Sequence, residues 1–302
     1  MSDAFLKADV RPTADPAEKK VQHGPWRDAA RSFAKNKTAL IGLCLVVFFV
    51  LLALVAPLIA PFDYKAQVLS DRLKPPSGEH WFGTDDLGRD IFSRVIYGAR
   101  ISLWVGLLSV VGSIVIGTLL GIIAGFYGKW VDMLISRVFD ILLAFPGILL
   151  AIAIVAILGP SLQNALYAIA IVNVPTYGRL VRSRVLSLRQ EEFITAARAL
   201  GANDGRILFK HILPNSLTPI IVQGTLGVAT AIIEAAGLGF LGLGAQPPDP
   251  EWGKMLSDSR QFIQTAPWTV IFPGLCILLT SLGFNLMGDG LRDTFDPKMK
   301  GR

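Results

Sequence analysis

Two carboxylates and two amides lie inside long apolar runs of this chain, and these are the side chains most able to do chemistry there. They are Asp140, Glu234, Asn173 and Asn285. An ionisable group at membrane depth is a functional candidate by default. Asp140 has Arg137 one turn away, so a structural ion pair is at least as well supported as a transport role. For Glu234, two alternatives stand evenly: it faces a conduit, or it hydrogen-bonds a neighbouring helix or serine.

A polar stretch between two apolar runs, residues 191–215, predicts two short helices with a corner between them. Its first half is rich in Glu, Ala, Arg and Leu, which are strong helix formers. Gly201 stands where a glycine ends a helix, and Asn203 can cap the next one. Pro214 has no amide donor and is expected to end that second helix. Such a pair would be a handle for a soluble partner.

Spacing within the first of these helices predicts which side chains share a face. Phe193, Ala197 and Leu200 recur at i, i+4 and i+7. The small Ala196 and Ala197 would let another protein approach the backbone closely.

The residues of known catalytic motifs are missing from the sequence. There is no phosphate-binding loop, HExxH or GxSxG pattern, and the three histidines His23, His80 and His211 are scattered. Cys44 and Cys276 lie within apolar runs, which predicts small buried residues and not a disulfide or metal site. We therefore expect no catalytic centre, no metal and no cofactor in this chain, so it is not an enzyme itself.

An acidic cluster, Asp85, Asp86 and Asp90, lacks the spacing of a calcium loop, which favours capping and ion pairing. Thr84 or Asp85 is expected to cap a helix here. The basic side chains of that helix are expected to extend toward lipid head groups; they are Arg89, Arg94 and Arg100.

The apolar runs that must position these residues predict an all-α membrane protein with six transmembrane helices. Of 302 residues, 52% are hydrophobic and only 17% charged, too apolar for an ordinary soluble domain. Each run is long enough to cross a ~30 Å hydrocarbon core. The six candidate spans are 39–60, 101–125, 133–158, 164–185, 219–243 and 267–289. Gly117, Gly121 and Gly125 in the second form a ridge that permits close helix packing.

Basic residues indicate the topology and account for the net charge of +6 without nucleic acid as a partner. With the N-terminus inside, 21 of the 29 Lys and Arg fall on the cytoplasmic side. This bias predicts cytoplasmic N and C termini. The first apolar run is expected to be an uncleaved anchor, because about 38 polar residues precede it.

The predicted organisation divides the chain into five parts. These are a disordered cytoplasmic tail (1–24), an interfacial helix with the first span (25–60), a periplasmic segment (61–99), a transmembrane domain (100–289) with a cytoplasmic coupling loop (186–218), and a cytoplasmic tail (290–302). Pro175 predicts a kink in the fourth span, Thr218-Pro219 predicts the start of the fifth, and Trp252 is expected at the membrane interface.

The polar stretch resembles the "EAA" loop of inner-membrane permease subunits of ABC importers. Ala196, Ala197, Gly201, Leu213 and Pro214 match that motif in register. The chain departs from it at two positions, with Thr195 in place of Glu and His211 in place of Ile.

The resemblance extends along most of the chain, in order. The segments RSFAKNKTALIG, FGTDDLGRDIFSRVIYGARISL, GAQPPDPEWGKMLSDSR and FNLMGDGLRDTFDPK look like the C-type permease subunit of dipeptide and oligopeptide importers, with the dipeptide subfamily most similar.

This resemblance implies a type I importer fold in a bacterial inner membrane. The implied partners are a homologous B-type permease, two ATPase subunits that bind ATP and Mg, a periplasmic peptide-binding protein, lipids and the peptide substrate. The residues implied to couple to the ATPase are Glu191, Glu192, Thr195, Ala196, Ala197, Arg198, Ala199, Gly201, Ala202, Leu213 and Pro214.

Other hypotheses remain at this point. The same pattern occurs in permeases for oligopeptides and nickel, and haem is a further possible cargo. A carrier driven by an ion gradient would use Glu234 and Asp140 as coupling groups, although six spans without an evident inverted repeat are few for that class. An intramembrane enzyme is disfavoured by the missing catalytic residues.

Overall fold

The computed structural model describes residues 31–295, and the regular elements of this part of the chain are all helices, as the apolar runs predict. In chain order the elements are α2 (Lys37–Ile59), η1 (Leu69–Asp71), α3 (Ile91–Tyr127), α4 (Lys129–Leu143), α5 (Gly147–Leu158), α6 (Leu162–Leu188), α7 (Glu192–Ala199), α8 (Asp204–Arg206), the π-helical turn η2 (Ile207–Ile212), α9 (Leu213–Phe240), α10 (Trp252–Ser259), η3 (Arg260–Phe262) and α11 (Trp268–Phe295). The predicted tail 1–24 and the first part of the predicted interfacial helix, residues 25–30, lie outside the described residues. The final tail was predicted to begin at 290, but α11 continues to Phe295.

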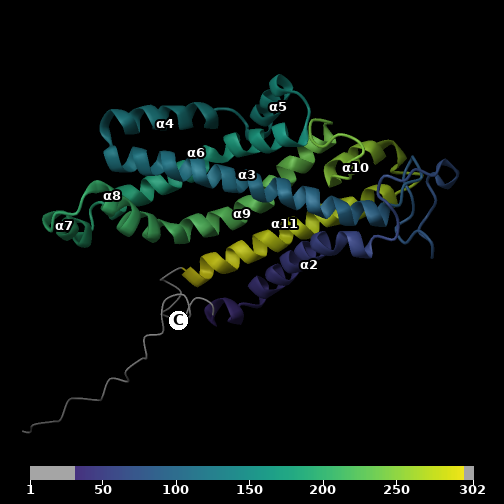
Figure 1. Cartoon of the computed structure of the whole chain (residues 1–302), viewed down its shortest axis with the longest axis horizontal. Helices are drawn as coiled ribbons and strands as arrows, with labels where there is room; N and C mark the ends of the chain where they lie inside the picture. The colour runs from purple at the N-terminus through teal and green to yellow at the C-terminus, as the bar shows by residue number, and fades with distance from the viewer. Residues whose placement is uncertain (1–30, 296–302) are drawn as a thin grey trace, which may run out of the picture.

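The long helices run side by side in one elongated bundle (Figure 1). Helix α3 lies at its centre, packed against α6, α9 and α2, while α11 packs between α2 and α9. The short helices α7 and α8 project at one end of the bundle, and α10 with residues 61–90 covers the other. The start of α2 and the end of α11 point toward the α7 end.

Four helices in the described residues are long and apolar enough to cross a membrane: α2, α3, α11 and the continuous helix 204–240, in which α8 and η2 lead into α9. The pair α4 and α5 passes the same test only together, bent by 92°. The segment predicted as one span, 133–158, is therefore not one continuous helix, because Pro146 precedes Gly147 at the break and cannot continue the ladder of α4. Helix α6 is too polar to pass this test by itself, and it packs along α3.

Helix α3 begins ten residues earlier than its predicted span, at Ile91. Its cap is Asp90, whose carboxylate accepts a hydrogen bond from the amide of Ser93 at 2.8 Å. Neither Thr84 nor Asp85 caps it, so that prediction is wrong. Because this single helix has 37 residues, it spans about 55 Å, more than a bilayer core, and its first turns belong to the end covered by α10.

Three apolar clusters follow one another along the bundle. The membrane core lies between α3, α5, α6 and α9 around residues such as Tyr177 and Ile232. The α10 cluster lies between α10 and its neighbouring helices and consists of Phe49, Ala53, Ile91, Val95, Ala99, Trp252 and Met255. The base cluster lies at the α7 end and consists of Phe126, Val181, Val185, Leu188, Ile194, Ile207, Ile212 and Ile220.

The predicted glycine ridge is the contact surface between α3 and α6. A methyl group on Gly121 would lie 2.5 Å from the carbonyl oxygen of Gly178, and one on Gly117 would lie 2.8 Å from the carbonyl oxygen of Val174. Backbones this close leave no room for any side chain. The prediction of close packing is confirmed.

Replacement of Gly121 by Ala should destabilise the bundle by about 1–3 kcal/mol, because the added carbon meets backbone that cannot move aside. Thermal unfolding of the purified protein in detergent measures the effect. Gly112→Ala is the matched control on the same helix, since its added carbon would meet Ala170 at an ordinary 3.5 Å. Equal melting temperatures for the two variants would contradict the assignment of the ridge.

Candidate functional site

The corner of the polar stretch is built as the sequence predicts. Helix α7 ends at Ala199, Leu200 is its C-cap, and Gly201 follows with φ +82°. The amide of Gly201 donates to the carbonyl of Arg198 at 2.9 Å, and the amide of Ala202 donates to the carbonyl of Ala197 at 3.0 Å. These two bonds form a Schellman motif, which satisfies the last carbonyls of α7 and fixes the direction of the chain that leaves it.

The second half of the stretch differs from the prediction at its end. Asn203 caps α8 as expected, accepting a hydrogen bond from the amide of Arg206 at 2.8 Å. Helix α8 then continues through η2 into α9, so Pro214 does not end a helix, and Thr218-Pro219 does not begin one. Pro214 stands in the first turn of α9, directly after the wider π turn, where its missing donor costs little.

The predicted apolar face of α7 is the outer face and not the buried one. Ile194, which the spacing argument left out, is 1% exposed and belongs to the base cluster. Phe193 is 42% exposed and Leu200 is 88% exposed, while Ala197 is half-buried. Of the other predicted coupling residues, Ala202 and Leu213 are half-buried, and the exposed ones are Glu191, Glu192, Thr195, Ala196, Arg198, Ala199, Gly201 and Pro214.

Two arginines join α7 to the spans in a way that the sequence did not indicate. The guanidinium carbons of Arg189 and Arg198 lie 5.7 and 5.8 Å from the ring centre of Phe126. Arg189 also donates from Nη1 to the carbonyl of Gly125 at 2.9 Å. Phe126 thus receives a cation–π contact from the end of α6 and another from α7.

Within the bundle, the structure brings together two of the predicted polar residues. Nδ2 of Asn173 donates to Oε2 of Glu234 at 2.9 Å, which joins α6 to α9. Asp140 pairs with Arg179 on α6 at 2.6 Å, both side chains being about half exposed, and not with Arg137. Asn285 is exposed on α11 and makes no side-chain hydrogen bond in the described part of the chain.

A second ion pair between α4 and α6 was missed. Arg182 binds Asp132 through Nε and Nη2, and the hydroxyl of Ser136 donates to the same carboxylate at 3.1 Å. Asp132 is far from Arg182 in sequence, so no local spacing rule connects them. With Asp140–Arg179, this pair fixes α4 alongside α6.

The cysteines differ from the prediction that both are buried. Cys44 is exposed on α2, and Cys276 is half-buried. The outer surface of a membrane helix is apolar too, so an apolar neighbourhood in sequence does not mean burial within the protein.

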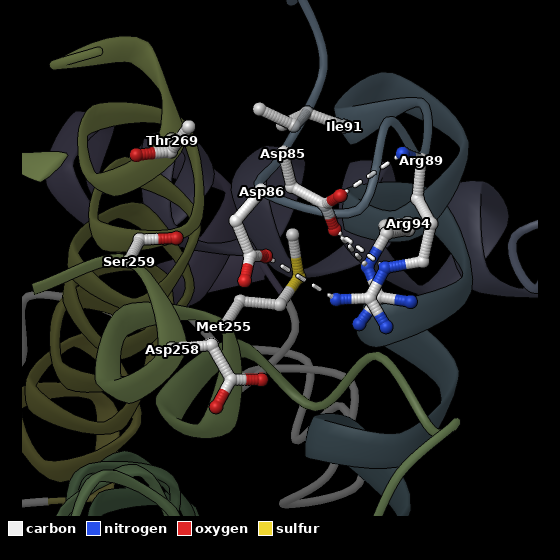
Figure 2. Close-up of a pocket in the computed structure, with 9 residues that line it drawn as sticks. All are labelled: Asp85, Asp86, Arg89, Ile91, Arg94, Met255, Asp258, Ser259 and Thr269. Carbon is white, nitrogen blue, oxygen red and sulfur yellow. Dashed lines mark hydrogen bonds and ion pairs between the residues drawn. The ribbon is translucent and has the colours of Figure 1, made fainter. Parts of the chain in front are cut away.

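At the opposite end of the bundle, a small polar pocket lies between the start of α3 and α10 (Figure 2). Arg89 binds Asp85 at 2.6 Å, and Arg94 lies 3.6 Å from the same carboxylate. Arg89 and Arg94 are 5% and 2% exposed, so the prediction that they extend toward head groups is wrong. Burial and the charge of Asp85 raise the pKa of Asp86. The predicted ion pairing of this acidic cluster is confirmed.

Trp252 is the first residue of α10, and its side chain is buried within the protein and not at the membrane interface as predicted. Its side chain is fully buried against Phe49, and its Nε1 donates to the carbonyl of Val95 at 3.0 Å. Glu251 caps α10 by accepting from the amides of Gly253 and Lys254 at 2.7 and 2.8 Å. Because that carboxyl is buried, its pKa is raised to about 7.

The raised pKa of Glu251 makes the α10 end sensitive to pH. The ordinary pKa of a Glu side chain is 4.5, so between that value and about 7 the folded state binds more protons than the unfolded chain. The stabilisation is full below this window and is lost as the pH rises through it. Hydrogen exchange of the α10 amides should therefore be faster at pH ~8 than at pH ~5, beyond the intrinsic rate change. Glu251→Gln should abolish this excess; a variant that keeps it would exclude Glu251 as its source.

Comparison with known proteins places this geometry in a family. Residues 117–301 match the model of the binding-protein-dependent transport system inner membrane component, and residues 24–76 match the N-terminal TM domain of oligopeptide transport permease C. The methionine ABC transporter MetNI, solved in inward-facing conformations, has the same fold with a TM-score of 0.54 at 22% identity, over 67% of this chain and 97% of that one.

Three relatives are similar over nearly their whole length. The dipeptide transport system permease protein DppC of Alkalihalophilus pseudofirmus is 68% identical over 91% of each chain. The di/tripeptide transport system permease protein DppC of Pseudomonas aeruginosa is 51% identical over 96% of this chain and 97% of its own. The glutathione transport system permease protein GsiD of Pectobacterium atrosepticum is 50% identical over 91% of this chain and 92% of its own. The chain therefore belongs to the family of binding-protein-dependent transport system inner membrane components and has the type I importer permease fold.

Proposed function

We propose that this chain is one of the two permease subunits of an ATP-driven dipeptide importer and forms half of its conduit. The family and the relative of highest identity among those above support this cargo. Glutathione is the second candidate, because a permease named for it is 50% identical over 91% of this chain.

The proposed partners follow from the family. A homologous B-type permease supplies the other half of the conduit, two ATPase subunits bind ATP and Mg, and a periplasmic protein delivers the peptide. We place the α7 end in the cytoplasm of a bacterium with the complex in its inner membrane. The start of α2 and the end of α11 point to that same end, which agrees with the positive-inside bias (Figure 1).

The observation that carries the coupling role is an exposed apolar surface on the projecting end of the molecule. Phe193, Leu200 and Phe209 are 42%, 88% and 73% exposed. Arg198 and the exposed Ala196 and Ala199 lie on the same short helix. Several large apolar side chains that are exposed close together along a water-facing segment favour a protein contact. Ile194 and the Schellman corner hold this surface rigidly to the base cluster, so an ATPase that moves α7 moves the spans.

The experiment is a crosslink from cysteine at Ala199 to the co-expressed ATPase subunits, with and without ATP, after Cys44 and Cys276 are replaced by alanine. Ala199 is exposed, so the substitution disturbs no packing. We expect an ATP-sensitive crosslink. A cysteine at the exposed Ser70, at the opposite end, is the matched control and should give none. A chain that transports dipeptides without any crosslink from residue 199 would contradict the coupling role.

The importer is also favoured over a gradient-driven carrier by the pairing of Asp140, one of the two carboxylates that such a carrier would use. Such a carrier needs carboxylates that are free to bind and release the coupling ion. Asp140 instead holds Arg179 at 2.6 Å and is only about half exposed. ATP dependence of uptake in reconstituted vesicles separates the two mechanisms.

A further inference from the structure

Glu234 differs from the acidic residues of α4 in having no basic partner within residues 31–295. Asp132 and Asp140 each bind an arginine of α6. Among residues 31–295, Asn173 is the only side chain or backbone group that hydrogen-bonds to Glu234. Asn173 is a neutral donor, so no residue among 31–295 that contacts this carboxyl would balance a negative charge on it.

The amide of Asn173 is itself held in place. Its Nδ2 donates to the carbonyl of Ile169 at 3.0 Å, one turn earlier in α6, as well as to Oε2 of Glu234 at 2.9 Å. This second bond fixes the orientation of the amide, which in turn fixes the carboxylate. Oε1 of Glu234 is left without a donor in the described structure. An oriented oxygen with an unused acceptor is suited to bind a cation or a strong donor.

Glu234 and Asn173 are both half-buried and lie beside the break between α4 and α5. A methyl group on Gly147, the first residue of α5, would lie 3.2 Å from Cγ1 of Val172, the neighbour of Asn173. One on Gly237, three residues after Glu234, would lie 3.6 Å from Cδ1 of Ile148. Helices are interrupted at membrane depth where they are buried in protein or line a watery cavity, and not where they face lipid.

The position of Glu234 along α9 determines the depth in the membrane at which a cargo would meet its carboxyl group. Glu234 stands six residues, about 9 Å, before the end of α9 at Phe240, on the side of the bundle covered by α10. In the orientation proposed above, this is the outer half of the membrane. A peptide delivered from outside would reach Glu234 before the ion pairs of α4.

We propose that Oε1 of Glu234, oriented by Asn173, binds the protonated α-amino group of the cargo as it enters the conduit. The cargoes in the relatives' names, dipeptide, di/tripeptide and glutathione, share a free α-amino group, although their side chains differ. A lone carboxylate selects that group without reading the side chains. This inference rests on the proposed function, because it takes the peptide as the cargo.

The test is protection of Glu234 from a hydrophobic carbodiimide, read by mass spectrometry on the full permease–ATPase complex in nanodiscs without binding protein. Ala-Ala and Ala-Ala amide keep the ammonium group and should protect Glu234, whereas N-acetyl-Ala-Ala should not. Asp140 in the same sample is the control, since it has Arg179, and its labelling should not respond to any of the peptides. Asn173→Leu should raise the Ala-Ala concentration needed for protection about tenfold, as expected for loss of the group that orients a charge-assisted bond.

Two results would overturn the assignment. Equal protection by N-acetyl-Ala-Ala would show simple occlusion. Labelling of Glu234 that none of the peptides changes would show that the cargo does not reach this carboxyl. ATP-driven uptake of Ala-Ala by the wild-type complex with its binding protein is measured separately. If that uptake is absent while protection remains, the proposed function fails and the ammonium site stands; if uptake is normal and protection is absent, the site fails alone.

Discussion

Gly201→Val should abolish ATP-driven uptake while leaving the membrane bundle folded. Gly201 has φ +82°, a conformation that costs an L-residue about 1–2 kcal/mol and a β-branched residue more. A carbon added there would meet nothing within 4 Å, so the effect is backbone strain and not a clash. Strain is relieved by opening the Schellman corner, which disconnects the surface of α7 from the base cluster.

A graded series at this position tests the cause. Asn adopts positive φ more readily than Ala, and Ala more readily than Val. Uptake should therefore fall in the order Gly, Asn, Ala, Val, while the melting temperature of the bundle changes little. Gly205→Val is the matched control, because Gly205 lies nearby in the chain but does not have a positive φ angle. A Gly201→Val complex with wild-type uptake would show that the corner does not transmit motion.

Phe126→Ala should raise the amount of ATP hydrolysed per dipeptide imported and should destabilise the α7 end. The ring is 5% exposed and lies in the base cluster, so its removal costs about 3–5 kcal/mol. It also removes the partner of Arg189 and Arg198, and with it the contact between α7 and the end of α3. ATP hydrolysed per dipeptide imported, together with thermal unfolding, measures the two effects.

Phe126→Leu distinguishes the cation–π contacts from packing alone. Leucine keeps most of the apolar volume but offers no ring face, so stability should largely recover while the ratio of hydrolysis to uptake stays raised. Trp130→Leu is the control, since Trp130 is 79% exposed nearby. Full recovery of both quantities in Phe126→Leu would assign Phe126 a packing role only.

Local features of the polar stretch and of the glycine ridge were determined by the sequence. The corner at Gly201 and the cap at Asn203 depend on the backbone preferences of single residues and on hydrogen bonds a few residues away. Close packing at Gly121 follows from its lack of a side chain, and this holds regardless of which helix packs against it. Such features are set within one turn of chain, which is why spacing alone predicts them.

Only the tertiary structure decided which apolar faces are buried and which charges are paired. Ile194 and Phe193 are both apolar and neighbour each other on the same short helix. Ile194 is buried because it faces the base cluster, whereas Phe193 is exposed because it faces outward. In a membrane protein, lipid, partner subunits and core all favour apolar side chains, so hydrophobicity does not distinguish them. The partners Asn173 and Glu234 are 61 residues apart, and only the packing of α6 against α9 brings the amide to the carboxylate.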